Sequence, residues 1–150
     1  MNTYGWEQLN CPYFKDTTRE ILADYLANLG FSEKRITNGG GVVYSNIDVF
    51  IEVGYDTNLF PNYSTRVVIG FGDGAYDELG AFSGIPMWYI IPKNHPYRTK
   101  VYWTFASKEE LLKILVEVKQ EFLETTVVPL LQNHQKLSTI IDNFQSEFCS

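Results

Sequence analysis

Hydrophobic side chains recur at helical spacing near the start of the chain and indicate its first helix. In steps of three and four residues, one helical face collects Ile21, Leu22, Tyr25, Leu26 and Leu29. Gly30 stands where helices often end in a left-handed residue, and Phe31 follows where it can contact Leu26. The pattern predicts a helix over residues 17–29.

The start of this helix has two candidate caps. Thr17 and Glu20 form a capping box, in which the threonine hydroxyl accepts from the glutamate amide and the glutamate reaches back. Asp16 is the alternative cap. Residues 1–15 read as an irregular arm that contains Cys11.

A second capping box, from Ser107 to Glu110, predicts the start of a long amphipathic helix in the last third of the chain. Its apolar positions are Leu111, Leu112, Leu115, Val118, Phe122 and Leu123. Pro129 interrupts this pattern, so we expect the chain to break near residues 125–126 and restart; a kinked continuous helix is the alternative. A last apolar stripe follows at Leu137, Ile140, Ile141, Phe144 and Phe148.

Alternation of side chains in the middle of the chain predicts strands. The run 47–55 has hydrophobic residues at its odd positions, and Asp48, Phe50 and Glu52 at even ones. It predicts a strand with one face on the core and the other face in water. Apolar runs bounded by turn residues predict the further strands 42–44, 66–72, 85–91 and 101–105.

These elements follow one another as a helix, about five strands and then helices. Strands joined by short loops pair antiparallel, and helices outside such a block pack on one face of the sheet. The sequence therefore predicts an α+β fold, a two-layer sandwich with an N-terminal helix, about five mostly antiparallel strands, and C-terminal helices packed on one sheet face. We expect residues 1–150 to form a single domain.

The chain is acidic, with a formal net charge of −6 at pH 7. Its densest basic group is Lys93, Arg98 and Lys100, which is too sparse to follow a phosphate backbone, so no nucleic-acid partner is expected. The charge either keeps the protein soluble or steers it toward a basic protein partner. The sequence shows no signal-peptide pattern and no apolar run of membrane-spanning length, so we expect a cytoplasmic protein without membrane contact.

Residues typical of catalysis or metal binding are sparse. His95 and His134 have no histidine or cysteine at metal-ligand spacing. Cys11 and Cys149 lie near the chain ends, where a nucleophile is hard to hold in position. The glycines of residues 38–41 lack the lysine and hydroxyl residue of a phosphate loop. We therefore assign no catalytic residue, no metal ligand and no cofactor.

Carboxylates form two candidate groups. A glycine-rich loop carries Asp73, Asp77 and Glu78. The spacing of these three does not match an EF-hand, so a polar, partner-facing loop is the better interpretation than a calcium site. Asp48 and Glu52 share a strand face, with Asp56 just beyond, where paired carboxylates could carry out acid–base chemistry. A solvated strand face is favoured over that chemistry.

Aromatic residues, which make up 15% of the chain, supply the other candidate surface. Two predicted strands, 85–91 and 101–105, and the turn between them carry Trp88, Tyr97, Arg98 and Trp103. An exposed cluster of this kind would be a binding surface with the tryptophans as anchors. Cross-strand aromatic pairs packed beneath a loop are the alternative.

Two segments, one before and one after the strand block, resemble segments of a known protein family. The helix end Leu29-Gly30-Phe31 and the return Val127-Val128-Pro129-Leu130-Leu131 resemble the bacterial domain-of-unknown-function family 4304 over most of the chain. This resemblance implies a bacterial cytosolic protein, similar to the immunity proteins of polymorphic toxin systems. The chain is also similar to type III secretion chaperones, small acidic α+β domains that are usually homodimers. Neither resemblance assigns a role to a residue.

Two classes of function follow. The first is a non-enzymatic protein-binding module, in its concrete form an immunity-type inhibitor that covers a basic site on a bacterial toxin. The second is a small-ligand-binding or enzymatic domain that uses the acidic loop 73–78 and the aromatic strands, which would require these groups to converge on a pocket. A secretion-chaperone-like protein is a further alternative.

Overall fold

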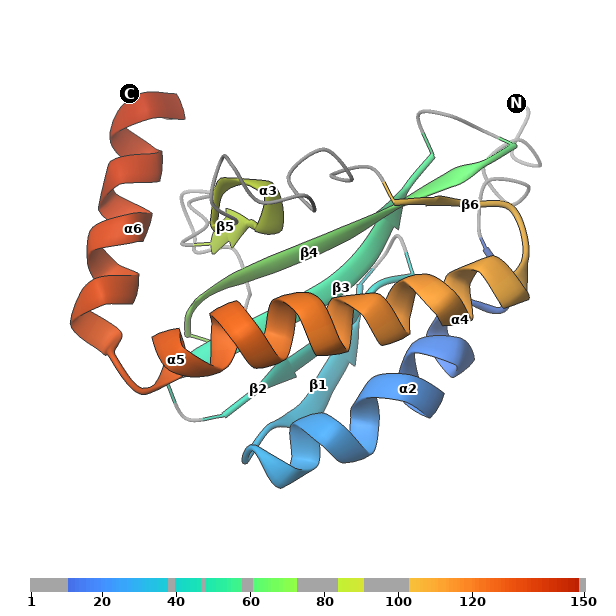
Figure 1. Cartoon of the computed structure of the whole chain (residues 1–150), viewed down its shortest axis with the longest axis horizontal. Coiled ribbons are helices and arrows are strands. Elements are labelled where there is room, and N and C mark those ends of the chain that lie inside the picture. The colour runs from blue at the N-terminus through green and yellow to red at the C-terminus, as the bar shows by residue number, and fades with distance from the viewer. Residues whose placement is uncertain are drawn as a thin grey trace.

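In the part of the chain that the computed structural model describes, six β-strands form one antiparallel sheet (Figure 1). The structure describes residues 11–37, 40–46, 48–57, 61–72, 84–90 and 103–148, apart from the side chains of Trp88 and Phe148. The strands are β1 (Ser32–Ile36), β2 (Val42–Ser45), β3 (Val49–Asp56), β4 (Tyr63–Phe71), β5 (Gly84–Pro86) and β6 (Thr104–Phe105). The first five lie in chain order, and β6 also pairs with β4.

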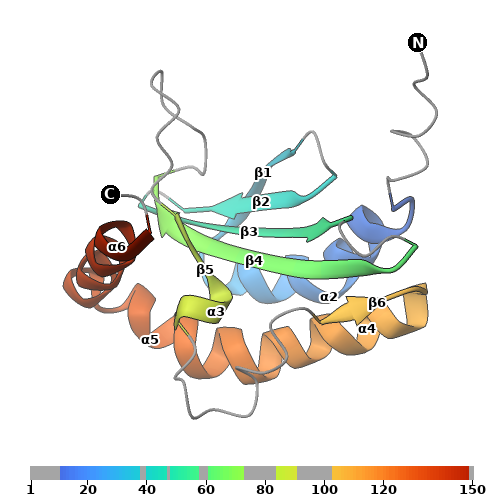
Figure 2. The same ribbon diagram turned by 90° about the horizontal axis from the view of Figure 1, so that it is seen from above.

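Among the described residues, helices precede and follow this block of strands, and one short helix lies between β5 and β6. They are α2 (Phe14–Asn28), the short α3 (Met87–Ile90), α4 (Lys108–Glu117), the π-helix η2 (Val118–Val127), α5 (Val128–Leu131) and α6 (His134–Phe148). Figure 2 shows α2 and α4 side by side against one face of the sheet, while α6 lies beyond the end of β4. The predicted α+β fold, with an N-terminal helix, antiparallel strands and C-terminal helices, is confirmed.

Helix α2 ends as the sequence predicts and begins elsewhere. Gly30 has φ +91°, the Phe31 amide donates to the Leu26 carbonyl at 2.9 Å, and the Gly30 amide donates to the Ala27 carbonyl at 3.0 Å, which is a Schellman motif. At the start, the predicted caps are wrong. No side chain caps the helix, which already begins at Phe14.

Tertiary packing explains the earlier start of α2. The Phe14 ring is fully buried, with its centroid 4.7 Å from the Tyr55 ring and 6.1 Å from the Phe105 ring. Burial of this ring brings the preceding turn into the helix, and Thr17 then lies inside it, fully buried. Cys11 is also buried, so the expectation of an irregular arm over residues 1–15 is wrong for its last residues.

The cap of α4 is confirmed. The Glu110 amide donates to the Ser107 hydroxyl at 3.2 Å, and Glu110 Oε1 accepts from the Ala106 amide at 3.0 Å. The glutamate therefore reaches back one residue further than the usual capping box requires. Both bonds satisfy amides at a helix start that would otherwise lack partners.

We expect Ser107→Ala to lower the free energy of unfolding by about 1 kcal/mol, because the Glu110 amide loses its acceptor. Urea denaturation followed by circular dichroism measures the change. Ser107→Asp is the matched variant, since aspartate is an equally good cap and should leave stability near that of the wild type. Equal midpoints for the alanine variant and the wild type would contradict a stabilising cap.

The chain does not break before Pro129. Helical turns continue from α4 through η2 and α5, up to Gln132, so the predicted break near residues 125–126 is wrong and the continuous alternative holds. Proline cannot donate to the carbonyl four residues earlier, and its ring crowds that carbonyl. Widening the preceding turns into a π-helix relieves the crowding, and the Thr125 hydroxyl donates to the Glu121 carbonyl at 2.6 Å.

Three strand predictions need correction. The edge strand β1 was not predicted, because its sequence Ser-Glu-Lys-Arg-Ile is mostly polar and does not alternate. In the predicted strand 85–91, only the start is extended, and Met87–Ile90 is helical. In the predicted strand 101–105, only Thr104–Phe105 is a strand among the described residues.

The two faces of the sheet differ in what they contact. The inner face, toward α2 and α4, carries Val49, Ile51, Val53 and Tyr55 of β3, all in the main core. The outer face carries the other residues of β3, and its predicted contact with water is wrong at Phe50 and Glu52, which are buried. A small second cluster of Val43, Phe50 and Val68 lies on this outer face.

Candidate binding surface

Most of the side chains predicted to bind a partner lie outside the described residues. They are Asp73, Asp77, Glu78, Tyr97 and Arg98, together with the side chain of Trp88. The acidic loop 73–78 therefore stays a prediction. His95 and Cys149 also lie outside the described residues.

The aromatic strands are not arranged as the sequence predicts. Strands β5 and β6 do not pair with each other. Both pair with β4, β5 at Val68–Gly70 and β6 at Tyr63–Ser64. Strand β3 pairs with β4 along the whole length of β3. Trp88 lies on the helix α3 between them.

Trp103 is 6% exposed, and its ring belongs to the main core rather than to an open surface. Its backbone has φ +28°, in the left-handed region. The Trp103 carbonyl accepts from the Thr65 amide at 3.3 Å and from the Thr65 hydroxyl at 3.1 Å. These two bonds attach the chain before β6 to the edge of β4.

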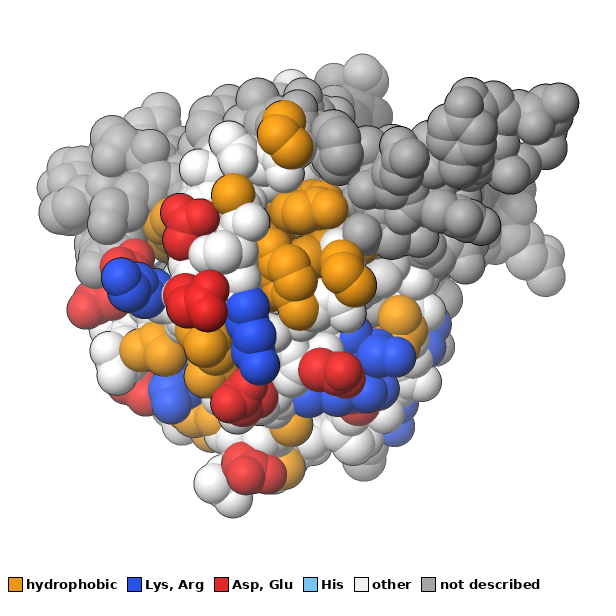
Figure 3. Space-filling view, turned by 90° about the vertical axis from the view of Figure 1, so that its right-hand side faces the viewer, with side chains coloured by type: hydrophobic (Ala, Val, Ile, Leu, Met, Phe, Trp, Pro, Cys, Tyr) orange, Lys and Arg blue, Asp and Glu red, His pale blue; other side chains and the backbone are white. Residues whose placement is uncertain are grey.

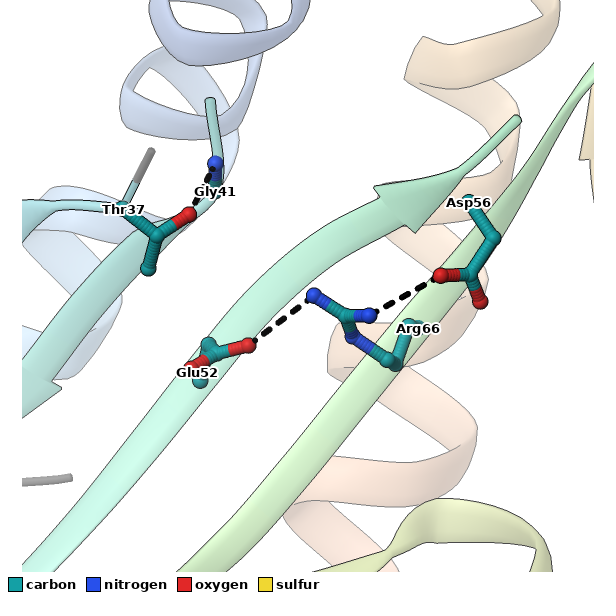
Figure 4. Close-up of polar contacts among 5 residues, drawn as sticks. All are labelled: Thr37, Gly41, Glu52, Asp56 and Arg66. Atoms are coloured by element: carbon teal, nitrogen blue, oxygen red, sulfur yellow. Dashed lines mark hydrogen bonds and ion pairs between the residues drawn. The ribbon is translucent and has the colours of Figure 1, made fainter. Parts of the chain in front are cut away.

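Three charged side chains join on the outer face of the sheet and form an ion triad of Glu52, Arg66 and Asp56 (Figure 4). Arg66 Nη2 lies 3.2 Å from Glu52 Oε2, and Arg66 Nη1 lies 2.9 Å from Asp56 Oδ1. One arginine of β4 thus bridges two carboxylates of β3. The sequence placed both carboxylates on one strand face but did not identify the arginine that joins them.

Strand register brings the triad together. Arg66 lies opposite Gly54, the residue midway between Glu52 and Asp56. Because Gly54 has no side chain, the guanidinium lies over it, and a Cβ atom there would be only 3.1 Å from Nη2. Arg66 can therefore reach diagonally to Glu52 and Asp56, which lie two residues before and two residues after the glycine on the same strand face.

The triad is partly open to solvent. The exposed fraction of the side chain is 41% for Arg66, 41% for Asp56 and 12% for Glu52. Ion pairs this exposed contribute at most about 1 kcal/mol each to stability. Two carboxylates against one guanidinium leave a net charge of −1, so the triad forms an ordered acidic position on the surface.

A second arginine near α2 also contacts two carboxylates, and this group has the same net charge of −1 as the ion triad. Arg19 on α2 donates to both carboxylate oxygens of Glu33 on β1, at 2.8 and 2.7 Å, and Asp16 lies 3.6 Å from it. The hydrogen bonds from Arg19 lower the pKa of the Glu33 carboxyl group. Figure 3 shows acidic and basic side chains interspersed around a group of hydrophobic side chains at this end of the molecule.

Cys11 is buried beside a cluster of tyrosines and phenylalanines rather than lying in an open terminal arm. Its backbone amide donates to the Tyr55 hydroxyl at 2.9 Å, and the Tyr55 ring lies 5.4 Å from that of Tyr63. Burial raises the pKa of the Cys11 thiol, which keeps it protonated at neutral pH. A buried neutral thiol is a poor nucleophile, so Cys11 contributes packing.

Neither a metal site nor a membrane span emerges from the part of the chain that the structure describes. No three histidine, cysteine, aspartate or glutamate side chains among those residues are placed to hold a metal ion. None of the described helices is long and apolar enough to cross a membrane.

The chain has no match among protein-family models, curated proteins or solved structures. Function is therefore inferred from the chain's own residues. Among the described residues, we select the ion triad as the candidate recognition site, because it is ordered and partly exposed and lies on a sheet face that no described helix covers. The only sequence signal for its central residue was a lone basic side chain, Arg66, in the otherwise β-branched run 65–69.

Proposed function

We propose that this chain is a protein-binding module that presents the ion triad to a basic protein partner. Its concrete form is an inhibitor of the immunity type, which covers a basic site on a bacterial toxin. The observation that carries the proposal is the position of Arg66, which holds Glu52 and Asp56 on a sheet face covered by none of the described helices.

Preorganisation supports this role. Arg66 bonds Oε2 of Glu52 and Oδ1 of Asp56, and within the described part of the chain the second oxygen of each carboxylate makes no hydrogen bond. Those oxygens remain available as acceptors for lysine or arginine side chains of a partner. Since the carboxylates are already ordered, less side-chain entropy is lost on binding.

Charge supports a basic partner. The whole chain carries a formal net charge of −6, of which the triad contributes −1 on the outer sheet face. Complementary charge accelerates the encounter of two proteins, and salt screens that attraction. Complex formation should therefore slow as the salt concentration rises.

The test compares proteins captured by the wild type and by the double variant Glu52→Gln/Asp56→Asn from an extract of cells that express the chain. We expect the wild type to retain a basic protein that the double variant loses. With the purified pair, the double variant should bind at least about tenfold more weakly, mainly through slower association at low salt.

The matched control is Asp24→Asn/Glu121→Gln, which removes the same charge from exposed carboxylates on the helical layer. This control should bind like the wild type, and thermal denaturation should show that both variants are folded. Equal loss of affinity in both variants would mean that binding depends on the total charge of the protein and not on the triad. That result, full binding by the triad variant, or no protein retained specifically by the wild type would overturn the proposal.

A further inference from the structure

A polar depression of about 480 Å³ lies where the end of α2 meets the sheet. It is lined by Gly30, Ser32, Lys34, Ser45, Asn46 and Asp48. The depression lies by the turn that precedes β3, whereas the ion triad occupies the later half of β3 and the middle of β4. The two features are therefore separate. The volume of the depression lies in the range of sites for small molecules.

Ser45 is the most informative residue of the wall. It is 2% exposed and lines the depression, yet its hydroxyl makes no hydrogen bond within the described part of the chain. Ser32 is its register partner on β1, so the two hydroxyl groups are neighbours on one face. A hydroxyl group in the wall of an open depression, with no hydrogen-bond partner among the described residues, is a position where a ligand atom can bind.

Asn46 adds a donor of known orientation. Its Oδ1 atom accepts from the Asp48 amide at 2.8 Å and from the Val49 amide at 2.7 Å. Because backbone amides can donate only to the oxygen, these bonds fix the orientation of the side-chain amide and the direction in which its NH₂ group points. No described residue accepts a hydrogen bond from that NH₂ group, which is free to donate to a ligand.

The lining of the depression also contains two side chains of opposite charge. Lys34 and Asp48 are both exposed, and neither forms an ion pair with any described residue. Lys34 is the extra residue of a β-bulge between Glu33 and Arg35, and a bulge re-aims the side chain that it carries. The described residues of the depression therefore combine one ammonium group, one carboxylate and several uncharged donors, and their charges cancel.

We infer that the polar depression binds a free α-amino acid with a polar side chain. The Lys34 ammonium group, the Asn46 NH₂ group and the Ser45 hydroxyl donate hydrogen bonds to the ligand carboxylate. The Asp48 carboxylate accepts hydrogen bonds from the ligand ammonium group. Gly30 follows Leu29, the C-cap of the 15-residue helix α2, whose dipole favours a cation and opposes a dianion such as phosphate. The described residues of the lining include no aliphatic or aromatic side chain, which matches a polar ligand side chain.

The inference is independent of the protein-binding function, and nuclear magnetic resonance tests it directly. Glutamine, serine and arginine are titrated into the ¹⁵N-labelled full chain, together with N-acetylglutamine, glutamine amide and inorganic phosphate. We expect saturable shifts at the amides of Ser45, Asn46 and Asp48 for at least one free amino acid. Blocking either end of that amino acid should weaken binding about tenfold, because each end loses a charged partner.

Variants locate the ligand. Ser45→Ala, Lys34→Gln and Asp48→Asn should each weaken binding of that amino acid about tenfold, while Lys15→Gln, an exposed lysine on α2, should have no effect. Lys34 and Asp48 are exposed, so their neutral variants test the site without disturbing the core. Shifts that never saturate, equal binding of the blocked amino acid, tighter binding of phosphate, or full binding by all three site variants would overturn the inference.

Discussion

Replacing Phe14 by alanine is expected to lower the free energy of unfolding by about 3 to 5 kcal/mol. The ring is fully buried at the start of α2 and contacts the Tyr55 and Phe105 rings, with centroid distances of 4.7 and 6.1 Å. Its removal leaves a cavity where the N-terminal helix, β3 and β6 meet. Urea denaturation followed by tryptophan fluorescence measures the change.

Two companion variants make this experiment specific. Phe14→Leu keeps most of the buried volume and should lose clearly less stability than the alanine variant. Lys15→Ala alters the next residue, which is exposed, and should change the free energy of unfolding by no more than about 0.5 kcal/mol. A Phe14→Ala midpoint equal to that of Lys15→Ala would show that α2 does not begin in the core.

Alkaline pH is expected to destabilise the protein through Tyr44. This side chain is 1% exposed, and burial raises its pKa from 10.0 to about 12, with a further rise from Glu33 and an opposing effect from Arg19. Tyrosine in the unfolded chain ionises near its ordinary pKa, so between these two values the unfolded state releases a proton that the folded state retains. The stabilisation present below pH 10 is therefore lost as the pH rises toward 12.

The size of this loss follows from the shift in pKa. About 1.4 kcal/mol per pKa unit gives a loss on the order of 3 kcal/mol from Tyr44 alone. Burial also raises the pKa of Tyr25, Tyr55 and Tyr63, which act in the same direction. Urea midpoints measured from pH 8 to pH 11 should fall steeply above the ordinary pKa of tyrosine.

Tyr44→Phe isolates the contribution of this residue. Within the described part of the chain, its buried hydroxyl has no hydrogen-bond partner, so the phenylalanine variant should be as stable as the wild type at pH 7, or more stable. Its stability should also fall less at high pH. Parallel pH profiles for the two proteins would contradict the assignment to Tyr44.

The ion triad and the polar depression place two different kinds of recognition on one domain. The triad offers two carboxylates that Arg66 orders from a neighbouring strand. The depression offers donors around Ser45 that no described residue pairs with. The capture experiment and the amino-acid titration test these two features separately, because each uses variants that leave the other feature unchanged.

Features that depend on hydrogen bonds between residues close together in the sequence could be predicted from the sequence. The Schellman end of α2 at Gly30 depends on a residue without a side chain and on bonds to carbonyls three and five residues back. The cap of α4 joins Ser107 and Glu110, three residues apart. The order of such local elements was enough to predict the α+β fold.

Long-range packing overrode other local signals. The threonine capping box gave way to a helix that begins at Phe14, because the buried phenylalanine ring stabilises an additional turn. The polar segment of β1 became a strand because β2 offered it an edge to pair with. Phe50 became buried on a sheet face that alternation alone assigns to water.

Both candidate sites were decided by tertiary structure. Arg66 meets Glu52 and Asp56 only because the register of β3 and β4 places the arginine opposite Gly54. Ser45 faces Ser32 only because β1 pairs with β2, with the bulge at Lys34 in that pairing. The sequence by itself determined where most helices and strands form, since those bonds link near neighbours. Which side chains meet across strands depends on register, and register is set by the packing of the whole sheet.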